Sequence, residues 1–383
     1  MTKEKNVLRV LMVTPRYFPD MGGIETHVHE VGRRLVRNGV NVTLLTTVPH
    51  TQDVLSNPHS RENVVEGMRV IRVQDWLPER DYCIAPEMYS IIKQGKWDLV
   101  HCQGCHTFVP PVGMMAAKAA KIPYVVTFHT GGHSSRLRSR IRGVQWNLLR
   151  PLLADASKLI GVSNFEANYF RDVLHIPATR FSVIRNGGAT LPDVTHLSPP
   201  PSNRLLIVSI GRLERYKGHQ HMIAALPKIR ERRPDAHLLI LGAGPYEADL
   251  REQAQRAGIA EHVDIRAVPA ENRQAMAETL SQAALVALMS EYEAHPVAVM
   301  EALTLRRPVL VADTSGLSEL AEQGLVRAVP LKSTLEEIAQ AALQQIEEPL
   351  VPPANFTLPT WDDCAKQLQE IYGVLAGRRL CAS

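Results

Sequence analysis

The sequence lacks most of the features that would place it outside the ordinary soluble proteins. Its 383 residues include only five cysteines, an odd number that argues against a disulfide framework and fits a reducing cytoplasm. No uninterrupted apolar run approaches the roughly 18 residues that a membrane-spanning helix needs. The net charge is only +4, from 43 basic and 39 acidic residues, too small an excess to indicate nucleic-acid binding. We therefore expect a cytoplasmic protein, peripheral at most on the inner face of a membrane, with no nucleic acid as partner.

What is present is a balanced composition and enough length for two cores. Apolar residues make up 45% of the chain and charged residues 21%, values typical of globular domains. A chain of 383 residues exceeds the usual size of one domain. Near the start, Arg9 and Arg16 interrupt the apolar stretch, so we expect a first strand there and not a signal peptide.

Short apolar segments alternate with amphipathic helical segments in both halves, which predicts an α/β fold with doubly wound parallel sheets. We predict one domain over residues 1–190 and a second over 204–360, joined by a linker at 191–203 that is rich in Pro, Gly and Ser. A last helix at 361–378 is expected to pack back on the first domain. Two such domains facing each other imply a cleft between them that binds ligands.

Two basic residues follow the first strand of the second domain. In SIGRLERYKG the strand ends at Gly211, and Arg212 and Lys217 lie in the loop before a helix. Cations near a helix N-terminus favour a diphosphate, because the helix dipole and the side chains both attract negative charge. The alternative is a pair of solvated surface cations.

Two carboxylates flank another helix start, in EAHPVAVME. Pro296 suits the first helical position, which would leave the backbone N–H groups of Val297 and Ala298 free for a ligand. Glu293 precedes this helix and Glu301 lies in its early turns, so the two could bind hydroxyl groups of a sugar and a ribose. Alternatively, Glu301 serves only its own helix dipole.

Taken together, these segments resemble a known family. SIGRLERYKG is similar to the arginine and lysine motif of the retaining glycosyltransferase family 4, and EAHPVAVME to its Glu-x7-Glu motif. PDMGGIETHV, VTFHT, GVSNF, VIRNGG and LGAGP resemble further segments of that family in the same order. The resemblance implies the GT-B fold: two Rossmann-like, doubly wound domains facing each other across a cleft, with the acceptor on the first and the nucleotide sugar on the second.

The resemblance also implies roles for individual residues. It places four in the catalytic site: His129, Arg212, Lys217 and Glu293. It assigns the donor to Gly22, Gly23, Arg212, Lys217, Gly242, Val268, Glu293, His295, Pro296, Val297, Ala298 and Glu301. Residues expected on the acceptor side are Glu25, His27, Arg136, Arg138, Arg140 and Arg142.

The implied reaction moves a hexose from a UDP-, GDP- or ADP-linked sugar to a hydroxyl of a sugar, lipid-linked or small-molecule acceptor. The anomeric configuration is retained, and the product belongs to polysaccharide, glycolipid or glycoconjugate biosynthesis. Arg212 and Lys217 would do the work of a divalent metal, so no metal and no cofactor are expected. A GT-B sugar-nucleotide epimerase, an inverting transferase and a non-catalytic GT-B binding subunit stay open as alternatives.

Three further features bear on these predictions. The arginines between Arg136 and Arg150 indicate either a solvated surface or a site for an anionic acceptor or membrane. Cys102 and Cys105 have zinc-like spacing, but no second Cys/His pair follows at the distance that a zinc site requires. The chain departs from the family pattern at Ala294, His295 and Pro296, and has Ser315-Gly316 where a double glycine is commoner, which leaves the donor undefined.

Overall fold

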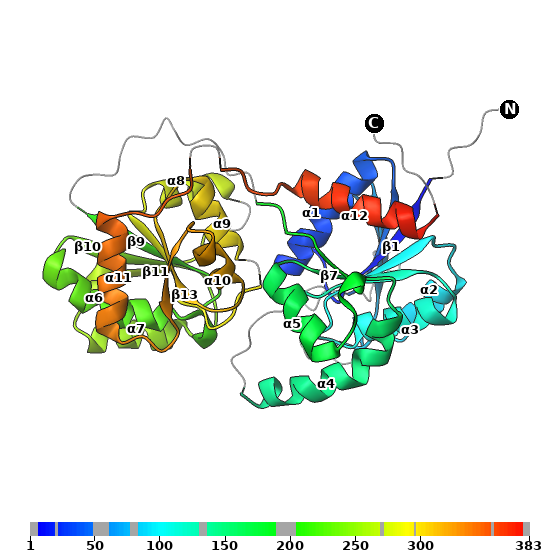
Figure 1. Ribbon diagram of the computed structural model, residues 1–383, viewed down its shortest axis with the longest axis horizontal. Helices are drawn as coiled ribbons and strands as arrows, with labels where there is room; N and C mark the ends of the chain where they lie inside the picture. Colours follow the sequence, from blue (N-terminus) through cyan, green and yellow to red (C-terminus); the bar gives the residue numbers. More distant parts are fainter. Residues whose placement is uncertain are drawn as a thin grey trace. The chain divides into compact units, whose positions relative to one another are not determined.

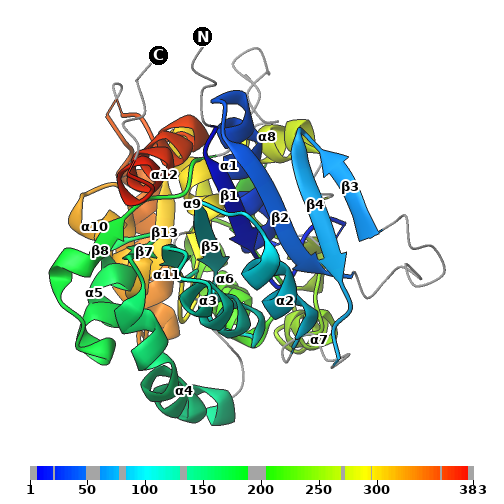
Figure 2. The ribbon, with the colours of Figure 1, turned by 90° about the vertical axis from the view of Figure 1, so that its right-hand side faces the viewer.

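The computed structural model describes residues 7–19, 22–48, 61–76, 83–129, 136–188, 204–268, 272–294, 296–353 and 356–377. They form two compact units, each built around its own sheet (Figures 1 and 2). The first unit takes residues 1–130, 139–187 and 359–383, and the second takes 131–138 and 188–358. The chain therefore passes from the first unit to the second twice, and it returns to the first unit for its C-terminal segment.

The sheet of the first unit has eight strands in the order β3-β4-β2-β1-β5-β6-β7-β8. The strands are β1 (Arg9–Val13), β2 (Asn41–Thr47), β3 (Glu62–Val65), β4 (Met68–Val73), β5 (Leu99–Gln103), β6 (Tyr124–Thr127), β7 (Lys158–Gly161) and β8 (Phe181–Val183). All neighbouring pairs are parallel except β3 and β4, which form an antiparallel pair at the edge. Neither strand was among the predicted apolar segments: β3 is largely exposed and carries no apolar pattern, although β4 is mostly buried.

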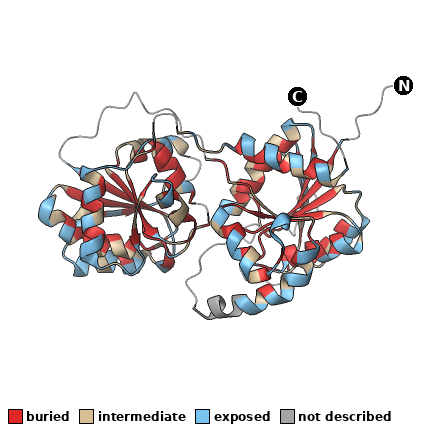
Figure 3. Cartoon of the chain, viewed as in Figure 1, coloured by how far each residue is buried: buried red, intermediate tan, exposed pale blue. Residues whose placement is uncertain are grey.

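Helices cover both faces of this sheet, and most residues of its inner strands are buried (Figure 3). Val10 and Met12 face a core shared with α1 (Gly23–Arg37) and α12 (Trp361–Leu375). Leu11 and Val13 point to the opposite core, as the two-residue period of a strand requires. That second core is completed by α2 (Glu87–Gln94), α3 (Val109–Ala119), α4 (Arg136–Asp155) and α5 (Asn164–Leu174).

The second unit repeats this design with six parallel strands in the order β11-β10-β9-β12-β13-β14. They are β9 (Leu205–Ile210), β10 (Ala236–Leu241), β11 (Val263–Arg266), β12 (Leu285–Leu288), β13 (Val309–Asp313) and β14 (Arg327–Pro330). One core holds α6 (His219–Arg232), α7 (Glu247–Arg256) and α11 (Leu335–Glu347). The other holds α8 (Arg273–Ser281), α9 (Val297–Thr304) and α10 (Ser315–Glu322). Two Rossmann-like units confirm the predicted fold class.

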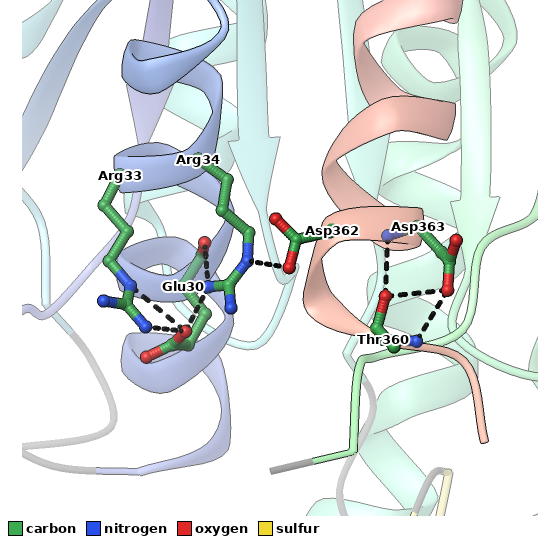
Figure 4. Close-up of polar contacts among 6 residues, drawn as sticks. All are labelled: Glu30, Arg33, Arg34, Thr360, Asp362 and Asp363. Carbon is green, nitrogen blue, oxygen red and sulfur yellow. Dashed lines mark hydrogen bonds and ion pairs between the residues drawn. The ribbon is translucent and has the colours of Figure 1, made fainter. Parts of the chain in front are cut away.

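The C-terminal helix α12 belongs to the first unit, where it lies beside α1 (Figure 4). Its start is set by a capping box: Thr360 Oγ1 accepts from the Asp363 N–H, and the Asp363 carboxylate accepts from the Thr360 N–H at 2.9 Å. Across the helix pair, Arg34 Nε lies 3.1 Å from Asp362 Oδ2. None of the helices in the described part of the chain is long and apolar enough to cross a membrane.

The approach of α12 to the first unit depends on a residue without a side chain at position 187. A Cβ added to Gly187 would lie 2.2 Å from the backbone nitrogen of Trp361, and backbone cannot move aside cheaply. Gly187→Ala is therefore expected to destabilise the first unit by about 1–3 kcal/mol. Urea unfolding followed by tryptophan fluorescence measures this loss.

Gly143→Ala is the matched control for this substitution. Gly143 is exposed within α4, and no described atom lies within 4 Å of an added Cβ. Alanine is the better helix former by about 1 kcal/mol, so this variant should be as stable as the parent or slightly more so. Equal urea midpoints for the two variants would contradict the role of Gly187.

Candidate functional site

The candidate site of the second unit lies where its strand order reverses. The chain runs outward from β9 to β10 and β11, then returns to the other side of β9 with β12. The helices that follow β9 and β12, α6 and α9, therefore pack in cores on opposite faces of the sheet, and ligands bind at such switch points in open parallel sheets. Lys217 follows β9 and Glu293 follows β12, so the topology brings together residues 76 positions apart.

Lys217 and Glu293 form an ion pair at this point. Lys217 Nζ lies 2.5 Å from Glu293 Oε1, and the buried Ser290 hydroxyl donates to the same oxygen at 2.9 Å. The two charged side chains are only 16% and 13% exposed, which strengthens their interaction relative to a surface pair. Sequence reasoning did not single out Ser290, because a serine after a strand has no distinctive pattern.

Close backbone packing holds the two loops together. Gly218 has φ +77, and an added Cβ would lie 1.9 Å from the Met289 carbonyl oxygen. The Glu291 N–H donates to the Tyr216 carbonyl at 2.8 Å. Only glycine combines this dihedral with this approach, so Gly218 sets the separation between the loops of Lys217 and Glu293.

Ser315 and Gly316 form hydrogen bonds with the backbone of Glu293. Ser315 adopts the left-handed conformation, φ +50, which glycine favours, and its Oγ accepts a hydrogen bond from the Glu293 N–H at 2.8 Å. The Gly316 N–H donates to the Glu293 carbonyl at 2.8 Å, and a Cβ there would lie 2.4 Å from the Ala294 carbonyl oxygen. Serine is thus accommodated at the first of these positions, while the second requires glycine.

The start of α9 corrects one prediction. Pro296 is the N-cap residue, with ψ 97 and therefore outside the helical region, and not the first helical residue that we expected. The helix begins at Val297, which is exposed, and continues with the half-buried Ala298. The first N–H groups of a helix have no partner within it, so these two remain candidate phosphate donors. His295 lies outside the described residues.

Glu301 is buried and already paired. Arg273 Nη2 donates to Glu301 Oε1 at 2.5 Å. Burial raises the pKa of the Glu301 carboxyl, and Arg273 partly offsets this shift. Arg273 comes from α8, far from the motif in sequence, so sequence reasoning missed it. Ribose binding by Glu301 stays a prediction, and a ribose would share this carboxylate with Arg273.

The remaining residues predicted to bind the donor in this unit lie in the loops after β9, β10 and β11. Arg212 is 68% exposed and pairs with Glu214 at 2.6 Å. Gly242 must be glycine, because an added Cβ would lie 1.9 Å from the Gly211 carbonyl oxygen. Val268 is half-buried at the edge of one core. Structure places all three at the same end of the sheet as Lys217.

The first unit has an equivalent switch point between β1 and β5. The loop after β1 leads to Gly22 and Gly23, and Gly23 is the first residue of α1. No described atom lies within 4 Å of a Cβ added to Gly23, so the first turn of α1 leaves room for a ligand. Glu25, predicted on the acceptor side, is buried with its Oε1 3.7 Å from Arg16 Nε.

Two histidines of this unit lie next to each other. The rings of His27 and His129 are 4.5 Å apart, edge to face, and His129 Nε2 lies 2.8 Å from Gln103 Oε1. His27 is buried, its Nδ1 is 2.7 Å from Asn186 Oδ1, and burial lowers its pKa to about 4. This burial disfavours the direct acceptor contact predicted for His27, and it puts the ring in contact with His129 instead.

The arginines predicted to bind the acceptor lie on the first turns of α4. They are Arg136, Arg138, Arg140 and Arg142, and their side chains are outside the described residues.

Further along α4, Val144 and Leu148 are 60% and 74% exposed. A cavity of about 420 Å³ lies between the end of this helix and the turn after α5. Its lining includes Arg150, His175 and Arg180.

The thiols of Cys102 and Cys105 are buried, and burial raises the pKa of Cys105 to about 12. The proton therefore stays on this sulfur at neutral pH, which disfavours metal ligation. Among the described residues, no three His, Cys, Asp or Glu side chains are grouped so that they could hold a metal ion.

Comparisons with known proteins cover nearly the whole chain. The family model for Glycosyltransferase Family 4 matches residues 21–188, and that for Glycosyl transferases group 1 matches residues 197–353. A glycogen synthase of Mycobacterium tuberculosis is 26% identical over 379 residues, with 89% of this chain and 87% of the relative covered. A GDP-mannose-dependent alpha-(1-6)-phosphatidylinositol monomannoside mannosyltransferase of Mycolicibacterium smegmatis is 26% identical over 367 residues, with 89% and 90% covered.

One solved structure with the same fold is Anabaena Alr3699/HepE in complex with UDP-glucose. It has a TM-score of 0.68 at 18% identity, with 97% of both chains covered. Because the two family models match successive halves of the chain, and both halves have the expected Rossmann-like sheets, the chain belongs to the family 4 glycosyltransferases and has the GT-B fold.

Proposed function

We propose that the protein transfers a hexose from a nucleotide-diphosphate sugar to a hydroxyl acceptor with retention of anomeric configuration. The observation that carries this proposal is the pair of Lys217 and Glu293 at the switch point of the second sheet. A cation for the diphosphate and a carboxylate for the sugar lie 2.5 Å apart there. The transferred sugar of such a donor is bonded directly to the diphosphate. The cation and the carboxylate that bind them are therefore needed close together.

In this proposal the second unit binds the donor. Lys217, with Arg212 from the same loop, stabilises the negative charge that develops on the diphosphate as the glycosidic bond breaks. The first N–H groups of α9, which have no partner within the helix, contribute to the same stabilisation. Glu293 accepts hydrogen bonds from sugar hydroxyls, and Glu301 accepts them from the ribose. Gly242, Val268 and Pro296 form backbone surroundings for the nucleotide.

The chemistry requires no carboxylate as base. The acceptor hydroxyl approaches the face from which the diphosphate leaves, and a phosphate oxygen takes its proton as the new glycosidic bond forms. Positioning of the two reactants and stabilisation of the leaving group supply the acceleration. Because Lys217 and Arg212 neutralise the diphosphate, the reaction is proposed to proceed without a divalent metal.

We propose that the first unit has its own contacts to the substrates. The open space at Gly23 lets a phosphate approach the start of α1, whose dipole attracts the same charge. His129 would contact the sugar, and the acceptor would bind on this unit near α1 and α4. The UDP-glucose in one structural neighbour and the GDP-mannose in the name of one relative support a nucleotide sugar but do not select the base.

For the acceptor we propose a lipid-linked or otherwise anionic molecule at a membrane surface on the cytoplasmic side. Exposed apolar side chains at Val144 and Leu148 lie one helical turn apart on α4. Arg150, His175 and Arg180 line the adjacent cavity without any acidic residue. Apolar side chains next to cations are typical of helices that lie at a membrane interface, and a phosphatidylinositol-linked acceptor in the name of one relative is consistent with this.

The roles of Lys217 and Glu293 are tested by single substitutions. Lys217→Met is expected to lower kcat by roughly 10²–10³-fold, the usual loss when one stabilising group is removed. Glu293→Gln should lower turnover without shifting the pH-rate profile, because it binds hydroxyls and exchanges no proton. Initial rates are measured with the UDP-, GDP- or ADP-sugar that most raises the Tm; a donor at a hundred times its Kd stabilises by about 2.7 kcal/mol.

Lys228→Met is the control for Lys217→Met. Lys228 also pairs with a glutamate, Glu231, but lies exposed on α6, and its replacement should leave the rate unchanged. An undiminished rate in Lys217→Met, or a titration limb lost in Glu293→Gln, would refute the proposed roles.

The reaction class is tested on the product. Proton NMR of the isolated product should show a new glycoside with the donor's anomeric configuration, formed at the same rate with and without a chelator. An inverted anomeric signal would indicate an inverting transferase, an epimerised sugar nucleotide would indicate an epimerase, and donor binding without any product would indicate a binding subunit. A rate abolished by chelator and restored by manganese would refute metal independence.

The membrane surface is tested with vesicles of phosphatidylcholine and phosphatidylglycerol. Leu148→Glu should reduce co-sedimentation with these vesicles, and so should reversal of the four arginines Arg136, Arg138, Arg140 and Arg142 to glutamate. Val374→Glu on α12 is the matched control, since Val374 is 79% exposed on another helix, and it should bind like the parent. Equal binding by all of these variants would exclude α4 as the membrane surface.

A further inference from the structure

The cavity beside the end of α4 lies at the edge of the first sheet opposite to the residues predicted to contact the donor. Its arginines, Arg150 and Arg180, precede β7 and β8, so they lie near the amino ends of these strands. Gly23 and His129 follow the carboxyl ends of β1 and β6, and all of these strands run parallel. A strand of four residues is about 13 Å long, so the cavity is separated from the predicted donor contacts.

Three segments of the first unit form this cavity. The turn after α5 contributes His175, and Arg180 directly precedes β8. One face of α4 contributes four residues at helical spacing: Asn147, Arg150, Pro151 and Ala154. The volume of about 420 Å³ lies within the range of small-molecule sites, so the cavity is large enough for an organic ligand.

Backbone carbonyls hold both guanidinium groups in place. Arg150 Nε donates to the Leu174 carbonyl at 2.8 Å, and Arg180 Nη1 donates to the Ala156 carbonyl at 3.0 Å. Within the described part of the chain, these are the hydrogen bonds that the two groups make. Each group therefore keeps two nitrogens for a ligand, and a pair of guanidinium nitrogens matches two oxygens of one phosphate.

Positive charge exceeds negative charge in this cavity. The carboxyl ends of α4 and α5 lie at the same edge, and each carries the equivalent of about half a negative charge, less in sum than two arginines. Asp155, at the end of α4, pairs with Lys118. Asp172 on α5 pairs with Arg171. None of the described residues that line the cavity is acidic, so an anion there meets no carboxylate.

We propose that this cavity is a second ligand site, which binds the phosphate ester of a polyol and takes no part in glycosyl transfer. Arg150 and Arg180 bind the phosphate, while Asn147 and His175 form hydrogen bonds with polyol hydroxyls, since both side chains can donate and accept. The headgroup of an anionic lipid and a soluble sugar phosphate share this chemistry. The inference does not rest on the proposed function, because the site uses none of the residues assigned to the reaction.

The alternative role of the two arginines is to cap helices. Leu174 ends α5 and Ala156 follows α4, and carbonyls at such positions have no partner within their helix. Capping alone predicts that substitution lowers the Tm and leaves phosphate binding unchanged. Measurements of both quantities on the same variants therefore separate the two roles.

Ligand binding is measured by isothermal titration calorimetry on the full chain, with glycerol 3-phosphate as the probe and glycerol as its uncharged counterpart. The parent should bind glycerol 3-phosphate at one saturable site and should not bind glycerol. Arg150→Gln and Arg180→Gln should each weaken binding by about tenfold or more, the loss expected for one charge-assisted hydrogen bond. Arg171→Gln is the matched control, since Arg171 lies on α5 outside the cavity, and it should bind like the parent.

Ala154→Leu tests the cavity without changing its charge or removing a capping bond. Ala154 is exposed on α4, where leucine is nearly as good a helix former as alanine, so the Tm should stay unchanged. The added side chain fills part of the cavity, and binding of glycerol 3-phosphate should be lost. Lys217→Met, altered in the second unit, should bind the probe like the parent.

Vesicles of phosphatidylcholine and phosphatidylglycerol separate the two sources of the phosphate ester. For a lipid headgroup, Ala154→Leu reduces co-sedimentation with the vesicles, and glycerol 3-phosphate competes with them for the parent. For a soluble ester, Ala154→Leu loses the calorimetric binding alone and sediments like the parent.

Several results would overturn the site. They are the absence of saturable binding by the parent in both assays, unchanged binding in Arg180→Gln and Ala154→Leu, and an equal loss in Arg171→Gln, which indicates a diffuse effect of charge. Binding lost only in Lys217→Met would place the probe in the donor site instead. If no nucleotide sugar yields a glycoside, the proposed function fails, while these binding experiments still decide the role of the cavity.

Discussion

The contact on which the candidate site most depends is the approach of Gly218 to the Met289 carbonyl. An added Cβ would lie 1.9 Å from that oxygen, so the loops after β9 and β12 meet only because position 218 has no side chain. This contact places Lys217 Nζ 2.5 Å from Glu293 Oε1. Ser290 donates to the same carboxylate oxygen, and Ser315 accepts a hydrogen bond from the Glu293 backbone N–H. The positions of Lys217 and Glu293 relative to each other therefore depend on packing between two backbone segments, which is more rigid than contact between long side chains.

The first unit has a different kind of support, a buried polar network that extends from Tyr372 on α12 through His101 and Gln103 to His129. Buried polar groups are costly unless they are hydrogen-bonded, and a network in which each group has a partner has few alternative arrangements. The C-terminal helix therefore takes part in the network that reaches His129. Gly187 permits this by leaving space for the backbone of Trp361.

Much of the fold was predictable from local patterns. The apolar strand segments and their amphipathic helices indicate Rossmann-like units, because burial on both faces of a parallel sheet imposes long apolar runs. The edge strand β3 was missed since most of it is exposed, and exposure removes the pattern on which such predictions depend. The position of Pro296 was wrong by one residue, since helix ends are the least determined part of any pattern.

By itself the sequence determined the family, the two-unit architecture, and Lys217 and Glu293 as candidates, because motif spacing and strand periodicity are local properties. Only the tertiary structure decided which side chain pairs with each candidate site residue. Arg273 on Glu301, Lys217 on Glu293 and Gln103 on His129 come from separate parts of the chain that the sheet order brings together. Hydrogen-bond partners depend on distances of a few ångströms between remote segments, and such distances leave no periodic trace in the chain.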